Sequence, residues 1–314
     1  MSTPISTSSE KDMNTNEVKK KKKRLLCIRH GISVANEWMQ QPGNQWGDAT
    51  FCDDPTLVDA KLSETGRLTS QTVLQRQLND NPLLHKTLQQ VELILVSPLT
   101  RCLETFQYGV EPLLLNNNNN NHNSNSHDDN NSNNNGRSSS STIPTLAVPL
   151  ICERVYTISD TGRSVGVLKQ EFPHINFDEC CPSEPWWYTG QQQESRSDET
   201  TLTTTNATTT TTNTTNTNPD SYKEWRPFGQ GQWYAVPGEP LQVFEERLQR
   251  FDEWLAKRPE TTILIVAHWG VLRHLAHEQD EWTNAEAKVL DWEYCTESLT
   301  RTVAVAKHQE HQQK

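Results

Sequence analysis

Short apolar runs alternate with segments of helical periodicity along most of the chain. The runs are the length of buried strands, and the first, Leu25-Leu26-Cys27-Ile28, has no polar interruption. The predicted strands are Leu25–Ile28, Val91–Val96, Thr145–Ile151 and Thr262–Ala267, with an edge strand at Thr300–Ala306. Helices are predicted to start near Ser33 and to span Ser63–Leu78, Ser97–Tyr108, Pro240–Lys257 and Val271–His277. Strands that alternate with helices predict an α/β fold with a doubly wound, mostly parallel sheet flanked by helices.

Helix starts are marked by capping residues. Ser63 is a good N-cap, and the helix after it carries a partial apolar stripe. The stripe consists of Leu62, Leu68, Val73 and Leu78. Ser97 followed by Pro98 predicts the start of another helix, with Ser97 as a cap rather than a substrate contact.

Two segments of low complexity interrupt this pattern. Residues 116–141 are almost wholly Asn, Ser, His and Asp, and residues 191–218 are dominated by Thr and Asn. Without apolar periodicity they cannot offset the entropy of ordering, so both are predicted to be disordered insertions. We also expect a disordered basic tail at 1–23 and a short tail at 309–314. About 230 residues remain, which fits a single domain over 24–308.

The net charge of −11 argues against a general nucleic-acid binder but leaves an anionic small-molecule substrate open. The seven cysteines lack framework spacing, and no apolar segment opens the chain or is long enough to span a membrane. We therefore expect reduced thiols, a cytoplasmic location and no membrane partner. The basic run Lys19–Arg24 is interpreted as a solvated tail, with a nuclear address or a phosphate-attracting arm as alternatives. The oligomeric state is left open.

Residues able to handle a phosphate group follow the predicted strands. They are Arg29 and His30 after the first strand, Arg101 after the second, Glu153 after the third and His268 after the fourth. Because ligands of open parallel sheets bind outside the carboxyl ends of the strands, these side chains are expected to converge on one pocket. Arginine grips phosphate oxygens, and histidine can act as a nucleophile or an acid–base group.

The block R-H-G-x-S-x-x-N is complete here, and it resembles the signature of the histidine phosphatase (phosphoglycerate mutase-like) superfamily, branch 1. Its residues are Arg29, His30, Gly31, Ser33 and Asn36. The later S-P-L-x-R block ending at Arg101, the glutamate at 153 and the histidine at 268 follow the family's order. Trp269 stands where the family commonly has glycine, although Gly270 follows it. Residues 168–188, with Glu171-Phe172-Pro173 and Trp186-Trp187, resemble a eukaryotic group within the superfamily.

The resemblance implies a mechanism and a set of site residues. His30 would attack phosphorus to form a phosphohistidine, and Arg29, Arg101 and His268 would stabilise the phosphoryl oxygens. Glu153 would donate a proton to the leaving oxygen. Asn36 could contact the phosphate or cap its helix. The site would need neither a metal nor a cofactor, and its partner would be a small phosphorylated substrate.

Several alternatives stay open. Asp160 is a second acid seven residues after Glu153, and it could instead cap the helix expected near Val165. Glu153-Arg154-Val155-Tyr156 is similar to the mutase-type E-R-x-Y, but Thr157 replaces the glycine of that pattern and no Arg-Arg pair follows. The tryptophans at 186, 187, 225 and 233 could cover the pocket or pack in the core. A phosphatase is therefore predicted, with a mutase, or a non-catalytic binding or scaffold protein on the same fold, as alternatives.

Overall fold

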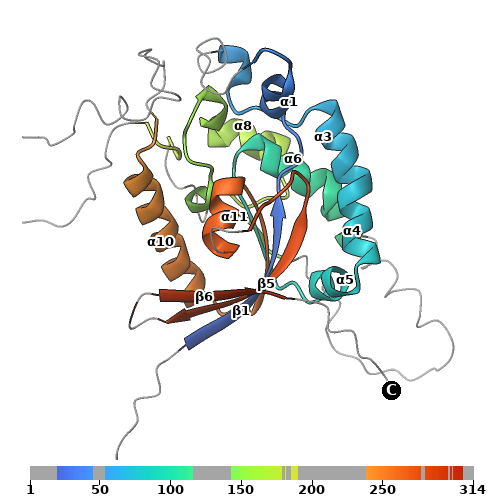
Figure 1. The fold of residues 1–314 in the computed structure, drawn as a ribbon, viewed down its shortest axis with the longest axis vertical. Helices are drawn as coiled ribbons and strands as arrows, with labels where there is room; N and C mark the ends of the chain where they lie inside the picture. The colour runs from blue at the N-terminus through green and yellow to red at the C-terminus, as the bar shows by residue number, and fades with distance from the viewer. Residues whose placement is uncertain are drawn as a thin grey trace, which may run out of the picture.

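The computed structural model describes residues 20–44, 54–115, 143–178, 181, 185–189, 238–276, 280–295, 298 and 300–306. The two predicted insertions, the C-terminal tail and residues 1–19 of the predicted N-terminal tail lie outside these ranges, as do Trp225 and Trp233. The described strands form one six-stranded sheet with helices on both faces (Figure 1).

The sheet has the order β3-β2-β4-β1-β5-β6. Its strands are β1 (Lys20–Arg29), β2 (Leu93–Val96), β3 (Thr145–Ala147), β4 (Thr262–Ala267), β5 (Ala287–Cys295) and β6 (Thr300–Val305). The first four strands are mutually parallel, whereas β5 runs antiparallel to β1, and β6 antiparallel to β5. The mostly parallel, doubly wound α/β fold is therefore confirmed, with an antiparallel pair added at one edge.

Alternate side chains of the central strands feed two separate cores. Leu26 and Ile28 of β1 belong to one core, and Leu25 and Cys27 to the other. The first core is covered by helices α4 (Gln75–Asp80), α5 (Pro82–Gln89), α6 (Thr100–Gly109) and α8 (Val165–Glu171). The second is covered by α10 (Leu241–Lys257) and α11 (Trp269–Ala276). Strands buried on both faces explain why their sequences are nearly continuous apolar runs.

Shorter helices complete the described chain. They are α1 (Val34–Gln40), α3 (Glu64–Thr69), the π-helix η2 (Ser70–Leu74), and the 3₁₀ helices η1 (Pro55–Leu57), η3 (Pro149–Ile151) and η4 (Ile158–Asp160). Ser63 caps α3 as predicted, and Ser33, near which a helix start was predicted, caps α1. None of the helices in the described ranges is both long and apolar enough to cross a bilayer.

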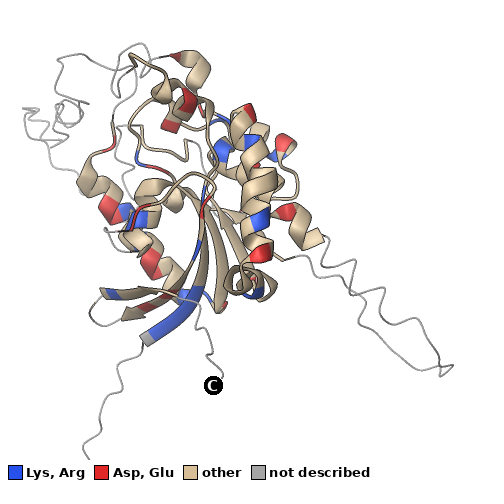
Figure 2. Ribbon diagram, turned by 45° about the vertical axis from the view of Figure 1, so that its right-hand side comes forward, with Lys and Arg blue, Asp and Glu red and all other residues tan. Residues whose placement is uncertain are grey.

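The predicted boundary of the N-terminal tail is wrong at residues 20–23. These lysines form the first part of β1, where they pair with β5 (Figure 2). The Lys23 side chain is buried, and its ammonium donates to the carbonyls of Arg258 and Glu260 at 2.8 and 2.7 Å. The error arose because β5 was not predicted, although Leu290, Trp292 and Tyr294 alternate with more exposed residues in the pattern of a strand.

The predicted apolar stripe of the helix after Ser63 is wrong at two positions. Leu68 and Val73 are exposed, whereas Leu74 and Leu78 are fully buried. The five residues of η2 adopt a π-helix between α3 and α4, which shifts the phase of the side chains relative to a continuous α-helix. A stripe read at a constant period of 3.6 residues therefore points to the wrong face in the middle of this segment.

Three other helix and strand boundaries differ from the predictions. Helix α6 begins at Thr100, so Ser97 is not its N-cap. Helix α11 begins at Trp269 rather than at the predicted Val271, so only His268 separates it from the end of β4. Strand β3 ends at Ala147, and a 3₁₀ turn replaces its predicted continuation to Ile151.

Candidate active site

The structure brings the five predicted residues to the carboxyl ends of the parallel strands. Arg29 ends β1, and His30 follows it. His268 follows β4, and Arg101 lies in the first turn of α6 after β2. Glu153 follows the η3 turn after β3, and its carboxylate reaches the N-terminus of α11. Segments far apart in the sequence thus meet at one edge of the sheet, as the strand-end argument predicts.

His30 is buried with a defined tautomer. Its Nδ1 lies 2.7 Å from the Gly31 carbonyl oxygen, which can only accept a hydrogen bond, so Nδ1 carries the proton. Burial, and then the charges of Arg101 and Arg29, hold the pKa of His30 well below its usual value. The ring is therefore neutral at pH 7, with an unprotonated Nε2.

The Arg29-His30-Gly31 segment is held from two sides by residues that the sequence analysis did not identify. The Thr105 hydroxyl of α6 accepts from the Gly31 N–H at 2.9 Å. The Asn284 amide donates to the His30 and Gly31 carbonyls at 3.1 and 3.3 Å. A side chain at Gly31 would lie 2.8 Å from the Ser70 hydroxyl, so only glycine permits this close approach. No motif marks Thr105 or Asn284, because their role depends on the neighbouring elements.

Arg29 is half-buried beside His30. One guanidinium nitrogen donates to the Trp282 carbonyl, while the buried Nε has no partner among the described residues. Burial lowers the pKa of Arg29, and the charge of Glu153 opposes this effect. A buried donor without a partner is unfavourable, and a phosphate oxygen would satisfy it.

Arg101 is buried and held by the loop that contains Asp160. Its two terminal nitrogens donate to the Ser159 carbonyl and the Asp160 carboxylate, both at 2.8 Å. Burial is the largest single effect and opposes the charged form, but Asp160 and the other acidic groups around it together outweigh burial, and the pKa of Arg101 is raised. The cation is therefore preserved in a buried position.

Asp160 does not cap the following helix, contrary to one of the two predicted roles. Its Oδ2 accepts from the N–H groups of Tyr156 and Thr157 at 3.1 and 3.2 Å. Ser164 caps α8 instead. With both oxygens occupied by backbone donors and Arg101, Asp160 organises the loop and orients the arginine.

Glu153 is partly exposed, and its carboxylate lies against α11. Oε2 accepts from the Gly270 N–H at 3.2 Å, and Oε1 accepts from the Arg154 N–H at 3.0 Å. A side chain at Gly270 would come within 2.5 Å of this carboxylate, so the glycine makes room for it. Burial, and then the charge of Asp160, raise the pKa of Glu153. A raised pKa is what a proton donor at neutral pH requires.

His268 is fully buried 5.1 Å from His30, measured between ring centroids. Its Nε2 lies 2.7 Å from the Ser97 hydroxyl and 3.4 Å from the Cys102 sulfur. Burial and the charge of Arg101 hold the pKa of His268 well below its usual value. Ser97 thus contacts the second histidine, a role that the predicted capping function did not include.

Asn36 uses its side-chain oxygen in the capping box of α1. This oxygen accepts from the N–H and the hydroxyl of Ser33, both at 3.1 Å. It also lies 3.4 Å from the Asn284 amide. The helix-capping alternative is therefore present in the structure, and a phosphate contact through the Asn36 amide stays a prediction.

Trp186 belongs to the packed core, and Trp187 packs against that core. Trp186 packs against Gly162 and donates to the Arg163 carbonyl at 2.9 Å. It contacts Trp187 edge-on, with ring centroids 5.1 Å apart. The predicted roles were to cover the pocket or to pack in the core, and these contacts are those of core packing.

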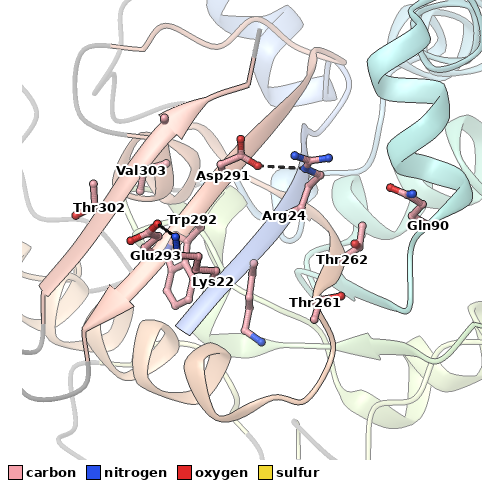
Figure 3. A pocket seen from close by; sticks show the side chains of 12 residues that line it. Lys22, Arg24, Gln90, Thr261, Thr262, Asp291, Trp292, Glu293, Thr302 and Val303 are labelled. Atoms are coloured by element: carbon pink, nitrogen blue, oxygen red, sulfur yellow. Dashed lines mark hydrogen bonds and ion pairs between the residues drawn. The ribbon is translucent and has the colours of Figure 1, made fainter. Parts of the chain in front are cut away.

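A separate cavity of about 530 Å³ lies at the other end of the sheet (Figure 3). Its cations are already paired, Lys22 with Glu293 at 2.8 Å and Arg24 with Asp291 at 3.1 Å. Within the described ranges no cluster of three or more His, Cys, Asp or Glu side chains could hold a metal ion.

Two arginines, two histidines that burial keeps neutral and a glutamate of raised pKa lie at the carboxyl edge of the sheet, an arrangement that is suited to phosphoryl transfer. The model of the histidine phosphatase superfamily (branch 1) matches residues 198–308, which contain α10, β4 and His268 but not the Arg29-His30-Gly31 block. This part of the chain is similar to that superfamily. The match supports phosphoryl transfer, of the phosphatase or the mutase type, as the chemistry of the site.

Solved structures with a similar course of the chain come from bacteria. A candidate alpha-ribazole-5′-P phosphatase of Escherichia coli has a TM-score of 0.42 and 17% identity, over 91% of this chain and 96% of that one. The alpha-ribazole phosphatase of Shigella flexneri has a TM-score of 0.41 and 18% identity, over 90% of this chain and 95% of that one. The phosphoglycerate mutase of Bacillus anthracis has a TM-score of 0.40 and 12% identity, over 93% of this chain and 95% of that one. A comparison with curated proteins gave no match.

Proposed function

We propose that the protein is a phosphatase that hydrolyses a small phosphomonoester through a phosphohistidine at His30. The observation that carries the proposal is the state of this residue. Its proton is fixed on Nδ1 by the Gly31 carbonyl, and its ring is kept neutral by burial and two arginines. A neutral imidazole with a free Nε2 beside two cations is suited to attack phosphorus.

The remaining groups supply charge and a proton. Nε2 of His30 forms a bond to phosphorus as the bond to the ester oxygen breaks, and Glu153 gives its proton to that oxygen. Arg29 and Arg101 stabilise the charge on the phosphoryl oxygens, with His268 beside them. Water then attacks the phosphohistidine, Glu153 takes up a proton from that water, and inorganic phosphate leaves.

Hydrolysis is favoured over a mutase reaction by the environment of Arg154. Its Nε donates to the Glu239 carbonyl at 2.6 Å, and its guanidinium lies 5.0 Å from the centre of the Tyr156 ring. An arginine engaged in this way is less available to grip a substrate carboxylate, as a phosphoglycerate mutase would require. A mutase would return the phosphoryl group to a second phosphoglycerate, whereas a phosphatase would release it to water.

Labelling of the enzyme tests the proposal. The purified protein is mixed briefly with ³²P-labelled phosphoesters and quenched without acid, and label on the protein is measured before and after acidification. We expect acid-labile label in the wild type and in a variant outside the site, His85→Ala. His30→Ala should lose both label and phosphate release while keeping its circular dichroism spectrum. Full labelling of His30→Ala would overturn the proposed mechanism.

A further inference from the structure

Glu153 lies in a stretch whose backbone no strand or helix holds. Strand β3 ends six residues earlier, the η3 turn ends at Ile151, and residues 153–156 have no regular structure. A proton donor must stay within hydrogen-bond reach of the leaving oxygen, so something else has to fix this stretch.

The side chain of Arg247, on α10, makes these missing contacts. One terminal nitrogen donates to the carbonyls of Leu150 and Cys152 at 3.0 and 2.9 Å, and the other donates to the Glu153 carbonyl at 3.3 Å. The arginine is held in turn by the Phe244 ring, whose centre lies 4.9 Å from the guanidinium carbon. A single side chain thus gathers the carbonyls on the amino-terminal side of the proton donor.

Glu239 completes the arrangement on the other side of Glu153. Its carboxylate pairs with Arg247 through two bonds of 3.0 and 2.8 Å, and its side chain is 1% exposed. The same carboxylate accepts from the Val155 N–H at 3.2 Å, and the Glu239 N–H donates to the Val155 carbonyl at 2.8 Å. The buried pair therefore holds the backbone both before and after Glu153.

We propose that Arg247, paired with Glu239, is the positioning residue of the proton donor Glu153. This inference rests on the proposed function, in which Glu153 protonates the leaving oxygen. Arg247 touches no reacting atom in this account. It fixes the backbone of residues 150–155, so that the Glu153 carboxylate stays against the N-terminus of α11.

The test compares two substrates that differ in their need for a proton. An alkyl phosphate has a poor leaving group, whereas p-nitrophenolate departs nearly unaided. The ratio kcat/KM reports the steps up to departure of the leaving group. Glu153→Gln, which keeps the shape but cannot donate the proton, gives the reference loss for the alkyl phosphate, about 10²- to 10⁴-fold.

Arg247→Met combined with Glu239→Gln removes both charges, which avoids leaving an unpaired buried carboxylate. We expect the kcat/KM of this double variant for the alkyl phosphate to fall by at least about 10-fold, which is part of the general-acid contribution. Its kcat/KM for p-nitrophenyl phosphate should stay within about 3-fold of the wild-type value, because that substrate hardly needs the proton. Arg247→Lys, which keeps the charge but cannot reach all the carbonyls, should show a smaller loss of the same kind. It serves as the test if the double variant does not fold.

A matched control is Arg258→Met, at the other end of α10. Arg258 also forms a two-bond pair with a glutamate, Glu260, at 3.1 and 2.8 Å, but it lies at the opposite end of the sheet from the site. Both substrates should be turned over at nearly the wild-type rate by this variant.

The Arg247 substitutions are then repeated in the Glu153→Gln protein. If Arg247 acts through Glu153, they should cause no further selective loss, because residues that act as a unit are not additive. A merely structural role predicts the same loss in both backgrounds, or an equal loss for both substrates, and either result overturns the inference alone. If Glu153→Gln itself shows no selectivity, the proposed proton donor is wrong and the inference falls with it.

Discussion

At the scale of single residues, the site depends on which atoms of each side chain are already occupied. Asp160 has both oxygens committed to backbone N–H groups and to the cation of Arg101, whereas Glu153 accepts only two backbone donors. Burial raises the pKa of both carboxyl groups, so the arginine contact and not the pKa distinguishes the two acids. Asp160 is therefore suited to hold an arginine and Glu153 to give up a proton. The sequence offered both acids as candidates, and the contacts separate them.

The leaving group should distinguish these two acids. We expect Glu153→Gln to cripple kcat/KM for an alkyl phosphate far more than for p-nitrophenyl phosphate. Asp160→Asn weakens the hold on Arg101, so it should lower kcat/KM for both substrates by a similar, modest factor. Steady-state kinetics of the two variants checks this expectation. If Asp160→Asn gives the selective loss and Glu153→Gln does not, the two roles must be exchanged.

The pH dependence of stability should reflect the buried neutral histidines. His30 has a pKa well below 6.5 in the folded state, but it binds a proton near that value when unfolded. Between these two pKa values the unfolded chain holds more protons, so the free energy of unfolding rises with pH, by up to about 1.4 kcal/mol per pH unit for each such group.

His30→Asn should therefore flatten this dependence between pH 5 and 6.5. Urea denaturation at several pH values measures it, with His85→Asn as a comparison outside the site. A slope equal to that of the wild type would show that His30 is not held neutral in the folded protein.

At the scale of elements, the start of α6 is capped from a distant part of the chain. The N-cap residue Leu99 has no side chain for this role, and the Asp59 carboxylate accepts from the Thr100 N–H at 2.7 Å. Asp59 also pairs with Arg163 at 2.9 Å, which ties the segment before α8 to the same point. Because Arg101 is the next residue of α6, Asp59 fixes the helix turn that presents this cation.

Asp59→Ala should lower the free energy of unfolding by about 2 kcal/mol or more, because it removes a helix cap and leaves buried donors without a partner. It should also reduce turnover of both substrates, since the turn that carries Arg101 loses its anchor. Thermal denaturation and kinetics measure the two effects. Asp54→Ala, which removes the cap of the short exposed η1 helix, is the control and should change both far less. Equal effects of the two substitutions would contradict the role given to Asp59.

At the scale of the whole molecule, the candidate site residues follow four strands of one sheet, β1 to β4. The Asn-rich segment 116–141 and the Thr-rich segment 191–218 lie outside the described ranges. Leu115 ends the described chain before the first segment, and the next described strand, β3, pairs with β2.

Excision of residues 116–141 and 191–218, each replaced by a short Gly/Ser linker, should leave stability within about 1 kcal/mol, because the entropy of closing a flexible loop grows only with the logarithm of its length. Calorimetry and phosphate release compare the shortened protein with the full chain. A cooperative loss of folding would show that one of the segments is structural and that the predicted single domain is drawn wrongly.

The sequence by itself determined the central part of the fold and the position of the site. Strands buried on both faces must be apolar throughout, so β1, β2 and β4 were visible as unbroken runs, and β4 was predicted with its observed bounds. The parallel arrangement followed from their alternation with helices. This in turn placed the residues after the strands at one edge, where the structure brings Arg29, His30, Arg101, Glu153 and His268 together.

Only the tertiary structure decided what each side chain does there. The π-helical phase of η2, the cap supplied by Asp59 and the hold of Arg247 and Glu239 on the Glu153 segment depend on contacts between residues far apart in the chain. A periodic pattern reports which face of an element is buried, but it does not report which distant donor meets which acceptor. The protonation and orientation of His30, Arg101 and Glu153 depend on those pairings, and so does the chemistry.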